Sequence, residues 1–143
     1  MTQQGPRGFV YWTKPARVIA LAIGVFYLLV GFWAFLDPAS FYSLVATFQP
    51  SNLHFLHDAG AFQVGLGLAL LLPAVLGRGL RLALVAVLAA SLLHFVAHVE
   101  DMRLGGHPAT DLTVLGLVCL ALGAALIVDT RSPAGSRARE ADR

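Results

Sequence analysis

The 143-residue sequence has few charged residues and a single cysteine. Only 13% of its residues are Asp, Glu, Lys or Arg, whereas 57% are hydrophobic, and the mean hydropathy is +0.73. A soluble domain of this size has too little interior to bury so much apolar surface, so the composition predicts a membrane protein. One cysteine, Cys119, excludes an intrachain disulfide or a thiolate cluster within one chain, and its apolar neighbours predict a packing role.

Several common functional motifs are also missing from the sequence. It contains no glycine-rich phosphate loop, no dinucleotide fingerprint, no nucleophile elbow and no internal repeat. The formal net charge is only +2, and we expect no nucleic-acid partner. The expected partners are the lipid bilayer and either a second copy of the chain or a larger membrane complex.

Four apolar runs are each long enough to cross the roughly 30 Å hydrocarbon core of a bilayer as a helix. They predict spans over about 17–36, 52–76, 80–101 and 111–128. The predicted fold is therefore all-α, an integral membrane four-helix bundle over residues 17–128. A basic, aromatic arm (1–16) precedes the bundle, and a polar tail (129–143), which we expect to be disordered, follows it.

The first apolar run ends at Asp37-Pro38. Asp is a good N-cap and Pro suits the first helical position, so a short helix is predicted to begin here. One side of this segment carries its large apolar residues: Phe41, Leu44, Val45 and Phe48. This pattern predicts a short interfacial helix between the first and second spans.

Small residues are spaced along two of the spans so that a neighbouring helix can approach closely. In the first span they are Ala20, Gly24 and Gly31, and in the second span they are Ala61, Gly65 and Ala69.

The basic residues predict how the bundle sits in the membrane. In a four-span arrangement nine of the ten fall on one side: Arg7, Lys14, Arg17, Arg78, Arg81, Arg131, Arg137, Arg139 and Arg143. The positive-inside rule makes this side cytoplasmic, so we expect a multi-pass protein of the cell inner (plasma) membrane with both termini in the cytoplasm. The same sorting puts all five histidines toward the outer side.

Histidines and carboxylates are concentrated at the outer ends of two spans. The third span carries polar residues at steps of three, four and three, which places them on one helical face: Ser91, His94, His98 and Asp101. The first turns of the second span carry another set within about 100° of arc: His54, His57 and Asp58. Ionisable groups in membrane helices are costly, so they usually face the bundle interior and mark function.

Imidazole and carboxylate groups are preferred ligands of Zn, Fe and Cu. We therefore predict a transition-metal site with a redox- or metal-linked role, formed from His54, His57, Asp58, His94, His98 and Asp101. Haem, which needs two axial histidines on facing helices, is a special case of this prediction. A quinone or proton-relay site without metal is one alternative. The other is a polar cap that satisfies the helix ends in an accessory subunit. The sequence identifies no reaction and no catalytic residue.

The first half of the chain carries a family resemblance. The segment GVFYLLVGFWAFLDPASFY, a histidine-rich link and then DAGAFQVGLGLALLL resemble small four-span bacterial membrane proteins of the DoxX-like kind, over roughly residues 18–76. The resemblance implies an up-down four-helix bundle. It also implies a link to quinone-dependent oxidoreductase complexes, with which some members of that group are associated.

Overall fold

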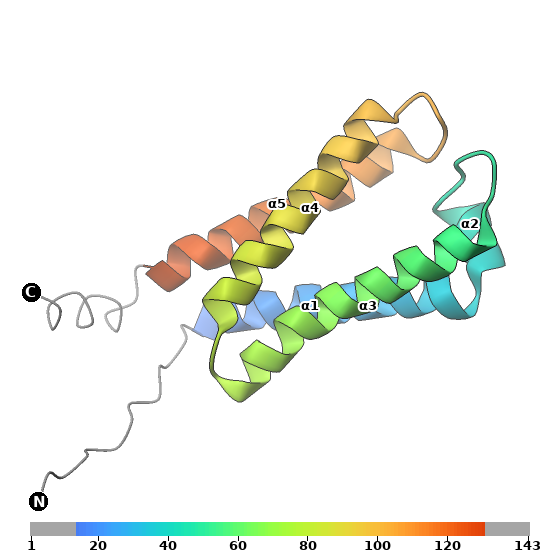
Figure 1. Ribbon diagram of the computed structural model, residues 1–143. Coiled ribbons are helices and arrows are strands. Elements are labelled where there is room, and N and C mark those ends of the chain that lie inside the picture. Colours follow the sequence, from blue (N-terminus) through green and yellow to red (C-terminus); the bar gives the residue numbers. More distant parts are fainter. Residues whose placement is uncertain (1–13, 131–143) are drawn as a thin grey trace, which may run out of the picture.

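Figure 1 shows the computed structural model, which describes residues 14–130. The described chain contains five helices and no strand: α1 (Lys14–Leu36), α2 (Pro38–Leu44), α3 (Leu53–Leu76), α4 (Leu80–Glu100) and α5 (Pro108–Thr130). Four of them, all except α2, are long and apolar enough to cross a membrane. The predicted all-α fold with four spans is confirmed, and the chain is a small polytopic membrane protein. Residues 1–13 and 131–143, which make up most of the predicted arm and tail, lie outside the described residues.

Local capping sets where the helices begin. α1 starts at Lys14 rather than Arg17, because a proline at position 15 is tolerated in the first turn. α3 starts after Asn52, whose side chain accepts a hydrogen bond from the Phe55 N–H at 3.1 Å. α5 starts at Pro108 rather than at residue 111, since Pro suits the first helical position.

The predicted short helix after the first span is confirmed as α2. Asp37 is its N-cap and accepts a hydrogen bond from the Ser40 N–H at 3.2 Å, with proline in the first turn. The Trp33 indole N–H of α1 donates to the Ser40 hydroxyl at 2.7 Å, which ties α2 back to α1. Phe41 is buried against α1 and α3. The helix is shorter than the apolar pattern suggested and ends at Leu44.

The long helices form two antiparallel pairs, α1 with α3 and α4 with α5 (Figure 1). The pairs meet at the end of the molecule where α1 begins and α5 ends, and they diverge toward α2 and the α4–α5 loop. The main core joins all four long helices near the first of these ends: Ala16, Ala20, Ile23, Tyr27, Leu70, Ala74, Leu80, Leu84, Val87, Val118, Leu122 and Ala125. The second core cluster joins only α1, α2 and α3, through Ala34, Phe41 and Leu56. The main core therefore joins the two helix pairs, whereas the second cluster belongs to one pair and α2 alone.

Glycines bring α1 and α3 into backbone contact. A Cβ placed on Gly31 would lie 2.7 Å from the Val64 nitrogen and 2.8 Å from the Gly60 oxygen, and one on Gly67 would lie 2.8 Å from the Gly24 oxygen. Gly24 and Gly31 thus serve the close approach that their spacing predicted. On α3 the prediction was wrong, because the contact uses Gly60 and Gly67, whereas the predicted small residues are exposed: Ala61, Gly65 and Ala69.

A buried hydrogen-bond chain joins α1 to α4. The Ser91 hydroxyl donates to the Val87 carbonyl at 2.7 Å, and the Tyr27 hydroxyl lies 2.7 Å from the same Ser91 oxygen. Because Ser91 has one hydroxyl hydrogen, Tyr27 is the donor to Ser91. Ser91 is only 1% exposed, so it belongs to the core rather than to the histidine-bearing end of its helical face.

Candidate functional site

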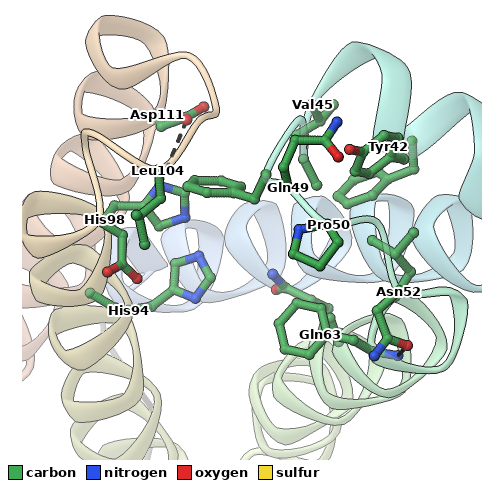
Figure 2. A pocket seen from close by; sticks show the side chains of 18 residues that line it. Tyr42, Val45, Gln49, Pro50, Asn52, Gln63, His94, His98, Leu104 and Asp111 are labelled. Carbon is green, nitrogen blue, oxygen red and sulfur yellow. Dashed lines mark hydrogen bonds and ion pairs between the residues drawn. The ribbon is translucent and has the colours of Figure 1, made fainter.

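A pocket of about 500 Å³ lies where the two helix pairs diverge (Figure 2). Its walls come from α2 and the segment after it, the first turns of α3, the last turns of α4 and the start of α5. Most of the lining is apolar: Phe41, Val45, Ala46, Phe48, Pro50, Phe55, Leu56, Ala59, Ala97 and Leu104. Pockets of this size and character are typical of small-molecule sites in proteins.

The wall formed by α4 and α5 carries two histidines on successive helical turns. The His94 and His98 ring centroids are 4.8 Å apart. His98 Nδ1 lies 3.6 Å from an Asp111 Oδ2 oxygen, a contact drawn as a dashed line in Figure 2. That oxygen also accepts a hydrogen bond from the His107 N–H at 2.8 Å. Asp111 is therefore held in place at the start of α5 and orients His98.

The opposite wall is formed by α2, α3 and the segment between them. Figure 2 shows Tyr42, Gln49, Asn52 and Gln63 across the pocket from the histidines. The Tyr42 hydroxyl and Gln63 Oε1 are buried and have no hydrogen-bond partner among the described residues. Both side chains line the pocket, and buried polar atoms in proteins are nearly always paired, so rotation of these side chains would bring two hydrogen-bonding groups to a partner that enters it.

The segment after α2 packs against the α4–α5 loop at the rim of the pocket. The Phe48 ring meets His98 edge-on, with centroids 5.6 Å apart. A Cβ on Gly106 would lie 2.7 Å from Phe48 Cζ, and one on Gly105 would lie 2.6 Å from the Thr47 oxygen. Both glycines also have positive φ, which side-chain-bearing residues rarely adopt. The loop glycines therefore let the two halves of the molecule touch beside the histidines.

The structure divides the six predicted metal-binding residues into two groups. His94, His98 and Asp101 line the pocket. His54, His57 and Asp58 do not line it. His54 and Asp58 form an exposed pair, with His54 Nε2 3.6 Å from Asp58 Oδ2. His57 packs on Phe35, with ring centroids 5.2 Å apart. Within residues 14–130, no three His, Cys, Asp or Glu side chains come together as a metal-binding group.

The rotation of α3 explains this division. Gly60 and Gly67 face α1 in backbone contact, and His57, one turn before Gly60, is carried toward α1 with them. The pocket is instead faced by Phe55, Ala59 and Gln63, at steps of four residues. A polar residue that the histidine pattern left out, Gln63, thus occupies the place opposite His94 and His98.

Five polar residues that line the pocket were not predicted from the sequence: Tyr42, Gln49, Asn52, Gln63 and Asp111. Asp111 could have been predicted from the sequence. It lies in the first turn of the fourth span, at the same predicted depth in the membrane as the histidines at the end of the third span. Gln63 is an isolated amide within an apolar span, which is itself a mark of function. Tyr42 carried no such signal, because aromatic residues are common at membrane interfaces.

No protein-family model matches the chain, and comparison with curated proteins and with solved structures finds no match. The resemblance to DoxX-like proteins therefore stays a prediction.

Proposed function

We propose that this protein binds a lipophilic small molecule with a ring-shaped, hydrogen-bonding head, of the quinone class, in the pocket between its helix pairs. The observation that carries this proposal is the arrangement of the lining. An apolar cavity of about 500 Å³ has polar groups on two facing walls, with His94 and His98 on one and Gln63 and Tyr42 on the other. A flat apolar ring with polar atoms on opposite edges complements such a site.

The place of the pocket in the bundle supports the same class of ligand. The pocket lies at the ends of the membrane-spanning helices, where a polar head would reside at the interface while its tail extends along apolar surface. Two apolar lining residues, Phe55 and Leu104, are 65% and 61% exposed and offer such surface at the pocket. Under the predicted topology, this end of the bundle lies at the outer leaflet of the inner membrane. The implied link of DoxX-like proteins to quinone-dependent complexes agrees with this assignment.

The test is saturable binding of decylubiquinone to the protein in lipid nanodiscs. One hydrogen bond between neutral groups is worth about 0.5–1.5 kcal/mol, so His98→Leu and Gln63→Leu should each weaken binding by roughly three- to tenfold. Glu100→Gln is the matched control, because Glu100 is exposed on α4 and does not line the pocket. Absence of saturable binding, or equal affinity of all four proteins, would contradict the proposal.

A transition-metal site remains the second candidate. The observation in its favour is the His94–His98 pair, with ring centroids 4.8 Å apart and Asp101 at the same pocket. Zn, Fe or Cu bound there should copurify in stoichiometric amount, be lost in His98→Ala and be retained in Glu100→Gln. Elemental analysis and an optical spectrum of the purified protein test this, and a Soret band would indicate haem.

A further inference from the structure

We infer that the pocket prefers the reduced, hydroquinone form of its ligand over the oxidised quinone. This inference rests on the proposed function and concerns which form of the ligand the polar walls recognise. A hydroquinone presents a hydroxyl donor at each end of its ring, whereas a quinone presents only carbonyl acceptors. The hydrogen-bonding character of the two walls therefore decides between them.

The α4–α5 wall offers an acceptor. In a neutral imidazole one nitrogen carries the hydrogen and the other carries a lone pair. His98 Nδ1 faces the Asp111 carboxylate at 3.6 Å, so the hydrogen is favoured on Nδ1, where it meets negative charge. The lone pair then resides on Nε2, the His98 nitrogen available to a ligand. Asp101, whose carboxylate also accepts hydrogen bonds, lines the same side.

The α2–α3 wall suits either form of the ligand. The Gln63 amide carries both an acceptor, Oε1, which has no partner among the described residues, and a donor, Nε2, and rotation of the amide exchanges the two. The Tyr42 hydroxyl, also unpartnered, can rotate to donate or to accept and so suits either form. None of the described residues that line the pocket is a lysine or an arginine, the side chains that would serve carbonyl oxygens as cationic donors.

The two forms of the ligand therefore meet these walls differently. A hydroquinone can donate to His98 Nε2 from one hydroxyl, while its other hydroxyl pairs with Gln63 or Tyr42. A quinone in the same place can accept from Gln63 or Tyr42, but it sets a lone pair against that of His98 Nε2. One neutral hydrogen bond gained by one form predicts a preference of roughly threefold to tenfold for the hydroquinone.

The experiment compares anaerobic binding of decylubiquinol and decylubiquinone to the protein in nanodiscs at pH 8. The wild-type protein should bind decylubiquinol roughly threefold to tenfold more tightly. Asp111→Asn should bring this ratio close to one, because an amide no longer fixes the hydrogen on His98 Nδ1. Gln63→Leu should weaken the binding of both forms and keep the ratio. Glu100→Gln should keep the wild-type ratio.

The outcomes separate this inference from the proposed function. Equal affinity for the two forms, or tighter binding of decylubiquinone, would overturn the preference while the binding function stands. A ratio that is unchanged in Asp111→Asn would also overturn it, because the His98 acceptor would not be its cause. Failure of the wild-type protein to bind either form would overturn the proposed function itself.

Discussion

The backbone contact between α1 and α3 should fail if Gly31 receives a methyl group. The Cβ of Gly31→Ala would lie 2.7 Å from the Val64 nitrogen, 2.8 Å from the Gly60 oxygen and 2.9 Å from Gln63 Cβ. Two of these neighbours are backbone atoms of α3 and cannot rotate away. The helices must therefore separate by several tenths of an ångström, or Gln63 and the pocket wall that it forms must shift.

The expected magnitude follows from two opposing effects. Overpacking of a close contact costs about 1–3 kcal/mol. Replacing Gly by Ala inside a helix recovers up to about 1 kcal/mol of helix propensity. Gly65→Ala in α3 isolates the second effect, because, apart from the local backbone of α3 itself, no described atom lies within 4 Å of its Cβ position. We therefore expect Gly31→Ala to be less stable than Gly65→Ala by about 1–3 kcal/mol.

The assay is reversible unfolding in mixed micelles of increasing SDS content, with helix loss followed by circular dichroism. Ligand affinity should be measured for both variants, since the Gly31→Ala methyl group also presses on Gln63. Equal stability of Gly31→Ala and Gly65→Ala would refute the close glycine contact and, with it, the rotation of α3 that brings Gln63 to the pocket.

In the same unfolding assay, Ser91→Ala should lower the free energy of unfolding by about 1–3 kcal/mol, because it leaves the buried Tyr27 hydroxyl unpaired. Tyr27→Phe should lower the same free energy by only about 0.5–1.5 kcal/mol. Hydrogen bonds from the Ser40 hydroxyl and the Ser40 backbone N–H hold the pKa of the Asp37 N-cap below the ordinary aspartate value of 3.8. Its stabilisation of α2 is therefore present above pH 3.8 and lost as the pH falls through the lowered pKa, and amide exchange in Asp37→Asn should lack this dependence. In a Cys-free protein, Ser51→Cys should react with impermeant thiol reagents outside intact cells and Arg78→Cys should not.

Each of these predictions has an outcome that would contradict it. If Tyr27→Phe were less stable than Ser91→Ala, the group left without a hydrogen-bond partner would be the Ser91 hydroxyl and not the Tyr27 hydroxyl. Amide exchange in α2 with the same acid dependence in Asp37→Asn as in the wild type would remove the carboxylate as its cause. Labelling of Arg78→Cys with Ser51→Cys silent would invert the membrane orientation.

The helices could be predicted from the sequence because their signals are local. Each span is a long apolar run, and the Asp37-Pro38 pair provides both a cap and a first-turn proline for α2. The starts of α1 and α5 lay earlier than predicted because proline was compatible with their first turns. In such a chain, hydropathy determines which segments become helices, and capping adjusts their ends.

The site was predicted only in part because it depends on helix rotation. The pattern placed His94 and His98 on a shared face correctly, and both line the pocket. It could not show that the glycines of α3 turn His57 toward Phe35 and bring Gln63 to the pocket instead. Four apolar helices have nearly uniform faces, so small residues rather than a hydrophobic stripe decide which side packs.

We propose above that a quinone-class ligand occupies the pocket between the helix pairs. Photoaffinity labelling with an azido-quinone carrying a decyl tail tests this claim most directly, using the full chain in nanodiscs and peptide mapping by mass spectrometry. We predict label within residues 41–63 and 94–111, which contain the pocket lining, and loss of that label when excess decylubiquinol is added. Label confined to the exposed lipid-facing residues of α5, such as Leu117 and Leu120, with no competition by decylubiquinol, would contradict it.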